Sequence, residues 1–442
     1  MSNHLIINKK IKNYNKEIEV DGDKSLSIRW ILFSSLASTK STAQNLLLSE
    51  DVMAAISTIR KLGIKVVIKN KICIVYGKGV EGYRYKKNLT LNAQNSGTLG
   101  RLILGLLINT PHPIKLIGDK SLSKRDFKRI TDPLTRFGAI FKLTNNKNLP
   151  LKVLGSKKLK PIYYEEKKGS AQCKSAVIFG GLRTDGSTLI KAKKSRNHTE
   201  LLFKYLKIPI KIKKTKKYDF INIKKPKKIK AFNYRIPGDI SSSAFFIVLA
   251  LLNKNSKILI KNVNVNKSRT GIIDILKKMK GKINLKNIKN NMGEKIADIV
   301  VQSTDNLKSI NCPINMNSRS IDEFLLIFLV ASQAKGISKF KKIEELRNKE
   351  TDRLSFGNNL LNKIGIKTKM TQDSIKIYGN PDLKLKDTYE IRKFDKDHRA
   401  CMVSFIAALT LGGKWKIHDI DSIKTSFPNF ISLLKQMGAK IN

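Results

Sequence analysis

Hydrophobic and polar positions follow one compound pattern that recurs along the chain. An amphipathic helical period ends in a small-residue turn, and two short segments of alternating apolar and polar residues follow, rich in Ile, Val and Lys. This pattern predicts an internal repeat of a helix followed by a strand hairpin. The copies lie at 56–76, 130–154, 201–223, 272–302 and 360–378, and the chain ends inside another at 431–441.

The turns that end the helical segments indicate how many repeats there are. They recur every roughly 70 to 85 residues, which predicts about six repeats. Because the strands come as hairpins, the pattern favours an α/β fold with mixed or antiparallel sheets over a doubly wound parallel sheet. The turn residues are Gly63, Gly138, Lys207, Gly281, Gly365 and Gly438.

The length of the chain favours two domains. A chain of 442 residues is long for one hydrophobic core, so we expect two similar domains of about three repeats each. Turn-forming polar segments before Gly22 and at 224–237 are the best boundaries. If the chain crosses between domains at both places, the first domain is 22–237 and the second combines 1–21 with 238–442.

The net charge of +53 suggests a nucleic-acid or membrane-surface protein when it is taken alone. However, the lysines are spread along the whole chain, and Lys, Ile and Asn are abundant together, as in proteins from genomes rich in A and T. A nucleic-acid-binding surface would also need interleaved aromatic residues, which make up only 7% of the chain. We therefore predict no nucleic-acid partner, and we attribute part of the charge to anionic substrates.

The remaining composition predicts a cytoplasmic protein without a metal or cofactor. The longest apolar runs, 244–252 and 324–331, are about half of what a bilayer span needs. The first residues lack the apolar core of a signal peptide. The cysteines and histidines are scattered without CxxC or HExxH spacing, so the cysteines are expected to be reduced and near the core. The cysteines are Cys73, Cys173, Cys312 and Cys401.

Short polar segments suited to anions interrupt the repeats. The segment 21–29 places Lys24, Ser25 and Arg29 in a loop and the start of a helix, where Lys24 and Arg29 could bind one phosphate or carboxylate. Gly97 lies at the start of the next apolar helix and lets a ligand approach backbone N–H groups. Arg125, in the loop 118–126, could face either solvent or a ligand.

Further polar groups occur where later helices begin. Segments 169–175 and 195–199 supply hydroxyl and amide donors, which also make ordinary helix caps. Asp322 and Glu323 precede an apolar helix, where a carboxylate is costly unless it is paired or used. Lys349, Glu350 and Arg353 are expected within one helical turn of one another, which also allows a simple ion-paired face.

Taken in order, these segments resemble the enolpyruvyl transferases, and specifically their shikimate-pathway branch. The resemblance covers nearly the whole chain and implies two similar domains of three helix-plus-sheet units, each an inside-out α/β barrel, hinged around an interdomain cleft. It is carried by the motifs GDKSLSIR, NSGTLGRL, GDKSLSKR, GSAQCKSA, SRNHTE, IPGDISSSAFF, SIDEF, ELRNKETDR, KDHRACM and IKTSFPNF.

The resemblance also implies which residues hold the substrates, phosphoenolpyruvate and shikimate 3-phosphate. Lys424 lies next to the position of a phosphoenolpyruvate-binding lysine in some members and is left unassigned. The implied ligands of shikimate 3-phosphate are Lys24, Ser25, Arg29, Ser170, Ala171, Gln172, Ser195, Arg196, Asp322 and Lys349. Those of phosphoenolpyruvate are Lys24, Gly97, Arg125, Gln172, Arg353 and Arg399.

The implied reaction adds the 5-hydroxyl of shikimate 3-phosphate to C2 of phosphoenolpyruvate and then eliminates phosphate. Asp322 is the candidate base, and Glu350 and Lys24 share the proton donations. The family chemistry uses no metal or cofactor, and the resemblance predicts a monomer that is sensitive to glyphosate. The alternative, a transferase acting on UDP-N-acetylglucosamine, normally has a reactive cysteine in the loop corresponding to 118–126, which contains none here.

Overall fold

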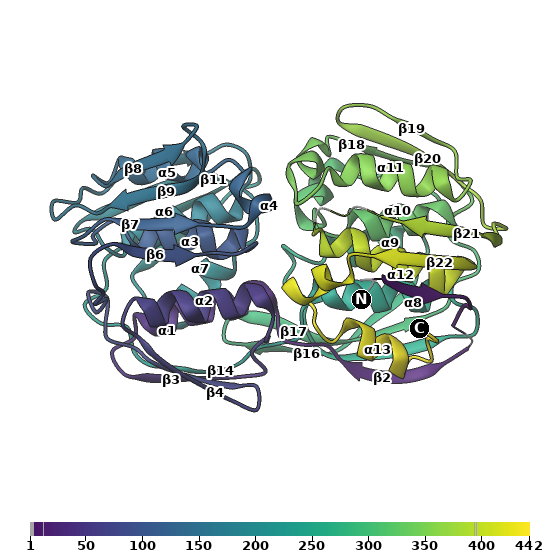
Figure 1. The fold of residues 1–442 in the computed structure, drawn as a ribbon, viewed down its shortest axis with the longest axis horizontal. Helices are drawn as coiled ribbons and strands as arrows, with labels where there is room; N and C mark the ends of the chain where they lie inside the picture. The colour runs from purple at the N-terminus through teal and green to yellow at the C-terminus, as the bar shows by residue number, and fades with distance from the viewer. Residues whose placement is uncertain (1–3, 12, 393, 395) are drawn as a thin grey trace. The chain divides into compact units, whose positions relative to one another are not determined.

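The chain forms two compact units, each with its own hydrophobic core. The structure, a computed structural model, describes residues 4–11, 13–392, 394 and 396–442 (Figure 1). Unit 2 comprises Gly22–Ile236 and Asn291–Glu294, and unit 1 comprises the described residues of Met1–Asp21, Pro237–Asn290 and Lys295–Asn442. The short segment Asn291–Glu294 was not part of the first domain expected from the sequence.

Unit 2 repeats one order of elements, in which a helix, a strand, a second helix and a hairpin follow one another. Its elements are α1 (Lys24–Ser35), β3 (Lys40–Gln44), α2 (Glu50–Lys61), β4 (Lys65–Lys69), β5 (Ile72–Tyr76), β6 (Leu89–Asn92), α3 (Gly97–Leu106), β7 (Ile114–Ile117), α4 (Lys120–Ser123), α5 (Lys128–Thr135), β8 (Ile140–Thr144), β9 (Asn148–Leu154), β10 (Tyr163–Glu166), α6 (Ala171–Gly181), β11 (Ser187–Lys193), α7 (His198–Tyr205), β12 (Ile210–Lys214), β13 (Tyr218–Lys224) and β14 (Asn233–Arg235).

Unit 1 repeats the same order, with three short 3-10 helices inserted among its described residues. Its elements are β1 (His4–Ile7), β2 (Asn15–Glu19), α8 (Ile240–Leu252), β15 (Lys257–Asn264), α9 (Gly271–Lys278), β16 (Lys282–Asn291), β17 (Glu294–Gln302), η1 (Ile314–Arg319), α10 (Phe324–Ser332), β18 (Gly336–Lys341), η2 (Glu344–Asn348), α11 (Arg353–Lys363), β19 (Thr368–Met370), β20 (Ser374–Gly379), β21 (Leu385–Ile391), α12 (His398–Leu411), β22 (Gly412–His418), η3 (Ile420–Thr425) and α13 (Phe430–Gln436).

The strands form small sheets, most of them mixed, which confirms the predicted fold class; the exception is β18-β20-β19, whose strand pairs are all antiparallel. In the sheet β10-β11-β13-β12, β10 runs parallel to β11, and the other neighbours are antiparallel. The parallel pair brackets α6, as a βαβ crossover requires. Counted over the described residues there are six sheets, whose orders are β14-β3-β5-β4, β6-β7-β9-β8, β10-β11-β13-β12, β16-β17-β15-β2, β18-β20-β19 and β1-β22-β21.

The chain forms a parallel edge strand just before each crossing between the units. β2 precedes α1 in sequence but pairs in parallel with β15 of unit 1. Correspondingly, β14 precedes α8 but pairs in parallel with β3 of unit 2. Each crossing strand therefore completes a sheet in the unit that the chain is leaving.

The two ends of the chain complete one sheet of unit 1 together. β1 pairs antiparallel with β22, and Ile7 in turn bridges to Ile441. The Ile6 N–H donates to the Asn442 carbonyl at 2.7 Å. The N-terminal strand therefore lies between β22 and Ile441, where a hairpin strand lies in other repeats.

The repeat turns are left-handed helix C-caps. Gly63, Gly138, Lys207, Gly365 and Gly438 all have positive φ, which suits glycine and explains the periodic signal. The exception is Gly281, because the left-handed residue is Lys280 at φ 70° and the Gly281 N–H donates to the Leu276 carbonyl at 2.8 Å. The predicted turn is thus displaced by one residue there.

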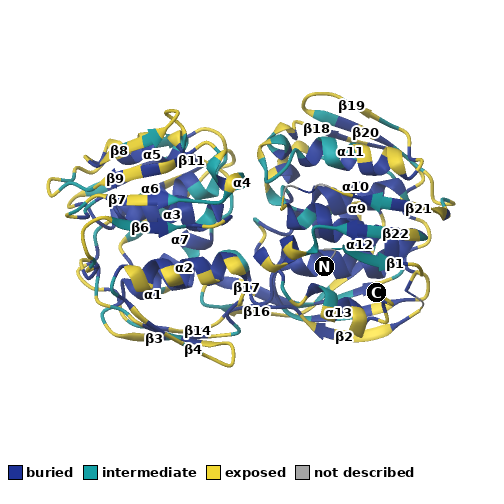
Figure 2. Ribbon diagram, viewed as in Figure 1, coloured by how far each residue is buried: buried dark blue, intermediate teal, exposed yellow. Residues whose placement is uncertain are grey.

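The first helix of each repeat is buried on nearly all sides. Nearly every residue of α8, α10 and α12 is buried in unit 1, as the dark blue ribbons in Figure 2 show. Their counterparts in unit 2 are α1, α3 and α6. An all-round apolar helix is stable only when other elements cover every face, and here neighbouring helices and sheets cover them.

Glycine allows α3 and α6 to pack closely. A Cβ atom built on Gly105 would lie 2.1 Å from the Ala176 carbonyl oxygen. No side-chain rotation relieves that contact, because the obstructing atom belongs to the backbone of α6. Gly105 therefore fixes the spacing between two buried helices.

Across the described residues, none of the helices has the length and apolar character needed to cross a bilayer.

The cysteines are all buried and free, as expected from their spacing; they are Cys73, Cys173, Cys312 and Cys401. Burial raises the pKa of the Cys73 thiol to about 12 and that of Cys312 to about 11. The thiols are therefore held in the unreactive protonated form.

Replacing Gly105 with alanine tests the close helix packing. We expect Gly105→Ala to lower the free energy of unfolding by about 3 kcal/mol, because the backbones of α3 and α6 must separate. Gly365→Ala is the matched control, since φ is 79° there and a Cβ would meet nothing within 4 Å. Only backbone strain of about 1 kcal/mol is expected for it. Urea denaturation measures both, and equal losses would contradict the packing argument.

Candidate active site

The predicted site residues lie at or just before the N-terminal ends of helices in both units. In unit 2, Lys24 and Ser25 begin α1, Gly97 begins α3, and Ala171 and Gln172 begin α6. In unit 1, Arg353 begins α11, and Arg399 is the second residue of α12. Helix N-termini carry unpaired N–H groups and a positive partial charge, so this arrangement suits anionic ligands.

Lys24 is held by a carboxylate from the neighbouring helix. Its Nζ lies 3.2 Å from Asp51 Oδ2, and both side chains are largely buried. Asp51 lies in the first turn of α2, where a negative charge also favours the helix dipole. The ammonium group is thus oriented before any ligand arrives.

Arg29 is fixed by hydroxyl groups of two other helices. Its Nε donates to Thr199 Oγ1 at 2.9 Å, and its Nη2 lies 3.4 Å from Ser175 Oγ. The hydroxyl oxygens of Ser175 and Thr199 lie 2.8 Å apart and hydrogen-bond to each other. Because Lys24 and Arg29 have these separate partners, the idea that both bind one anion stays a prediction.

Guanidinium groups surround the start of α3. A Cβ on Gly97 would lie 2.9 Å from Arg101 Nη1 and 3.1 Å from Arg125 Nη1. Arg101 Nη1 also donates to Gln172 Oε1 at 2.6 Å. Arg125 Nη2 donates to Asn95 Oδ1 at 3.3 Å, so both arginines hold defined positions beside the backbone of Gly97. Forked guanidinium donors of this kind match carboxylate and phosphate groups.

Two serines complete the polar groups of unit 2. The Ser170 hydroxyl caps α6 by accepting the Cys173 N–H at 3.3 Å. The Ser195 Oγ atom is buried and has no hydrogen-bond partner in the described parts of the chain. A buried hydroxyl without a partner is unfavourable unless a ligand or water satisfies it. Ser195 is therefore a suitable ligand group next to Arg196.

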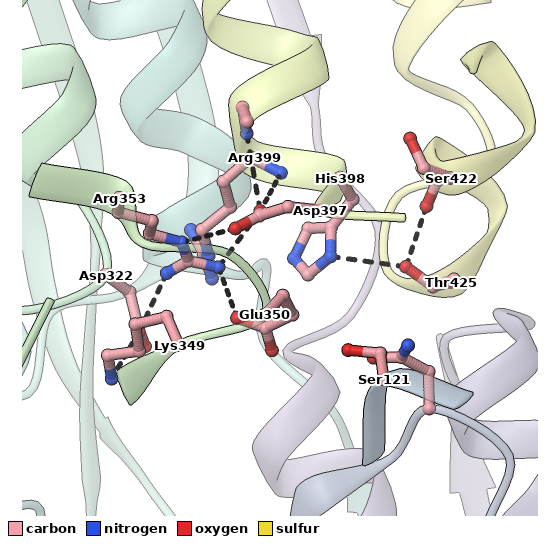
Figure 3. Close-up of polar contacts among 12 residues, drawn as sticks. Ser121, Asp322, Lys349, Glu350, Arg353, Asp397, His398, Arg399, Ser422 and Thr425 are labelled. Carbon is pink, nitrogen blue, oxygen red and sulfur yellow. Dashed lines mark hydrogen bonds and ion pairs between the residues drawn. The ribbon is translucent and has the colours of Figure 1, made fainter. Parts of the chain in front are cut away.

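In unit 1, a carboxylate and two cations come together from separate loops. Asp322 Oδ1 lies 3.4 Å from Lys349 Nζ and 3.6 Å from Arg353 Nη1 (Figure 3). The expectation that Lys349, Glu350 and Arg353 share one helical turn was wrong, because η2 ends at Asn348 and α11 begins at Arg353. Lys349 has extended backbone instead, which directs it to Asp322.

Arg353 is the centre of the polar cluster in unit 1. Its Nη2 lies 2.7 Å from Glu350 Oε2, and Asp397 binds it in bidentate fashion through Nε at 2.8 Å and Nη2 at 3.1 Å (Figure 3). Burial alone would lower the pKa of Arg353, but Asp397, Glu350 and Asp322 raise it above its ordinary value. The buried guanidinium is thus permanently charged.

Arg399 joins the same cluster through its backbone and side chain. Its backbone N–H donates to Asp397 Oδ1 at 2.9 Å. Its Nη1 lies 3.8 Å from Glu323 Oε1, and the Ser241 hydroxyl hydrogen-bonds to that same oxygen. Asp397 therefore binds the Arg353 guanidinium and also caps α12 at the backbone N–H of Arg399.

Sequence reasoning missed the groups that hold the site in place. Asp51, Arg101 and Asp397 each contact a predicted ligand residue, yet none was assigned a role. Asp397 carried a signal, since an aspartate directly before an apolar helix is a typical N-cap. Asp51 and Arg101 had none, because their partners are distant in sequence or on another helix.

Two further observations concern groups outside this arrangement. Lys424, left unassigned from the sequence, is exposed and pairs with Asp421 at 2.6 Å. No group of three or more His, Cys, Asp or Glu residues that could hold a metal ion occurs among the residues the structure describes.

Comparisons with known proteins agree over nearly the whole chain. The family described as EPSP synthase (3-phosphoshikimate 1-carboxyvinyltransferase) matches residues 8–434. The 3-phosphoshikimate 1-carboxyvinyltransferase of Caldicellulosiruptor bescii is 38% identical over 432 residues, covering 97% of this chain and 98% of the relative. That of Ruthia magnifica subsp. Calyptogena magnifica is 39% identical over 427 residues, covering 96% of each.

A solved structure extends the agreement to the fold. EPSP synthase from Acinetobacter baumannii superposes with a TM-score of 0.87 at 32% sequence identity, and the match covers 99% of both chains. The repeated helix-plus-sheet units, the polar groups at the helix N-termini and the full-length sequence match lead to the same result. This chain belongs to the EPSP synthase family of 3-phosphoshikimate 1-carboxyvinyltransferases.

Proposed function

We propose that this chain transfers the enolpyruvyl group of phosphoenolpyruvate to the 5-hydroxyl of shikimate 3-phosphate, with release of phosphate, in the shikimate pathway to aromatic amino acids. The observation that carries the site assignment is the cluster of Asp322, Lys349, Glu350 and Arg353, which joins candidate acids and bases to fixed cations. Family membership supplies the reaction, and the helix N-termini supply groups for two anionic substrates.

In this proposal, shikimate 3-phosphate takes most of its ligands from unit 2. The buried Ser195 hydroxyl and the fixed Arg29 guanidinium supply donors, and Arg196 neutralises the phosphate. Asp322 and Lys349 are the proposed ligands from unit 1. The remaining ligands are Lys24, Ser25, Ser170, Ala171 and Gln172.

Phosphoenolpyruvate carries a carboxylate and a phosphate, and both require cationic donors. Arg125 and the backbone of Gly97, which has no side chain to block a ligand, supply one part of its site. Arg353, which Asp397 already holds, and Arg399, whose guanidinium lies beside Glu323, supply the other. Lys24 and Gln172 complete the set. Donors that are ordered in advance lose little conformational entropy on binding, which supports both affinity and rate.

The proton transfers are assigned to the groups nearest the reacting atoms in this scheme. Asp322 accepts the proton of the attacking 5-hydroxyl as C2 of phosphoenolpyruvate forms its new C–O bond. Glu350 and Lys24 share proton donation to C3 and to the departing phosphate. The division between these two, the monomeric state and the glyphosate sensitivity remain predictions.

An acceptor-dependent assay tests the reaction and the base together. With phosphoenolpyruvate present, we expect phosphate release with shikimate 3-phosphate and none with UDP-N-acetylglucosamine or without an acceptor. Asp322→Ala should lower kcat by about 100-fold to 10,000-fold, as expected for loss of a general base. Asp274→Ala is the control, because it breaks a comparable 2.6 Å pair with Arg319 outside the proposed site. Wild-type turnover by the Asp322 variant would refute the assignment.

The requirement for glycine at position 97 can be tested separately. Gly97→Ala places a methyl group among the guanidinium nitrogens of Arg101 and Arg125, so the KM for phosphoenolpyruvate should rise about tenfold. Inhibition by glyphosate, which competes with phosphoenolpyruvate in this family, should weaken in parallel. Gly100→Ala is the control on the same helix, where a Cβ would meet Phe127 and Ala93 but no charged group. An unchanged KM in Gly97→Ala would show that phosphoenolpyruvate does not bind there.

A further inference from the structure

Lys174 and Glu200 form a buried ion pair that the proposed reaction does not use. Lys174 Nζ lies 2.6 Å from Glu200 Oε1, with side-chain exposures of 0% and 4%. Two charges are removed from water at considerable cost, and replacing such a pair by apolar residues is often neutral or stabilising. Stability alone is therefore a weak reason for this pair.

The location of the pair connects it to the proposed shikimate 3-phosphate ligands. Lys174 follows Gln172 by two residues on α6, and Glu200 lies in the first turn of α7, after Ser195 and Arg196. The adjacent Ser175–Thr199 contact joins the same two helices at 2.8 Å. The ion pair thus ties together the two helix starts that carry these ligands.

Glu166 shapes the loop before α6. Glu166 is buried, and its carboxylate accepts the backbone N–H groups of Lys168 at 3.1 Å and Gly169 at 2.6 Å. Burial raises the pKa of Glu166 above its ordinary value, and the backbone hydrogen bonds and then the charge of Lys174 offset this only in part. The two backbone hydrogen bonds make Glu166 the acceptor that shapes the loop leading to Ser170.

The Ser195 hydroxyl is the independent sign that a ligand completes this region. Its Oγ atom is buried without a hydrogen-bond partner among the described residues, at the start of the segment that Glu200 anchors. Small displacements of that segment would move Ser195 and Arg196 away from a bound phosphate or hydroxyl group. Displacements of about 1 Å at such positions can cost up to about 100-fold in activity.

We propose that the Lys174–Glu200 pair is a positioning element for shikimate 3-phosphate, which orients the Ser170 and Ser195 loops at the starts of α6 and α7. The inference rests on the proposed function of the site. Neither residue contacts substrate in this scheme, because both act through the loops they hold. Their effect falls on affinity for shikimate 3-phosphate rather than on the chemical step.

The experiment uses a double substitution that should preserve the fold. In Lys174→Met/Glu200→Met, two apolar side chains of similar length replace the pair, so no buried charge is left unpaired. Thermal unfolding should remain close to that of the wild type. Nevertheless, the Kd for shikimate 3-phosphate from calorimetry and its KM should rise about tenfold. The kcat at saturating substrates should stay within about threefold of the wild-type value, since the proposed acids and bases are untouched.

Lys191→Gln/Glu165→Gln is the matched control. That pair joins β11 to β10, with Lys191 Nζ 3.0 Å from Glu165 Oε1, and it is partly exposed and links strands instead of the two helices. It should leave the Kd unchanged. If the double-Met variant folds normally and binds shikimate 3-phosphate with the wild-type Kd, the positioning role is refuted. If the double-Met variant does not fold, the single Lys174→Arg variant, which keeps the charge, must retain more affinity than Lys174→Met for the inference to stand.

Failure of the proposed function would look different. In that case the wild-type protein itself would show no heat of binding with shikimate 3-phosphate and no acceptor-dependent phosphate release. The wild-type measurements therefore separate the two claims before any variant is compared.

Discussion

The burial of one helix per repeat is the constraint on which the rest of the structure depends. α1, α3 and α6 in unit 2, and α8, α10 and α12 in unit 1, are covered by other elements on nearly every face. Their only polar groups without intrahelical partners are at the ends, so polar side chains must collect there. The first turns are therefore suited to anions, because their backbone N–H groups lack intrahelical partners.

Cations at these helix starts would repel one another without fixed carboxylates. Asp51 pairs with Lys24, and Asp397 pairs with Arg353. Asp397 also accepts the backbone N–H of Arg399 as the N-cap of α12. Each carboxylate lies behind a cation that is proposed to meet substrate, so the cation is oriented and its charge is only partly neutralised. Preorganised charge of this kind favours transition-state stabilisation because little reorganisation accompanies the reaction. The net charge of +53 therefore contributes to the proposed site through a few cations, such as Lys24 and Arg353, whose side chains are oriented by carboxylate partners.

The strands at the two crossings between units each complete a sheet within a single unit. β2 and β14 each complete a sheet of the unit that the chain is about to leave. β1 and Ile441 complete another sheet from opposite ends of the chain. The chain beside both predicted boundaries therefore contains strands with specific partners.

The sequence by itself determined the repeat, the fold class and the family. Periodic apolar positions and left-handed turn residues such as Gly63 and Gly365 are local features, and local sterics and hydrophobicity suffice to read them. Motifs at the helix starts predicted the site residues by resemblance. Only the tertiary structure decided which charges meet: Asp322 with Lys349, Arg353 with Asp397, and Lys174 with Glu200. These partners lie 26 to 44 residues apart, and the backbone of Lys349 is extended where a helix was expected. Pairing over such separations depends on how helices and loops pack, and no local pattern of residues encodes that geometry.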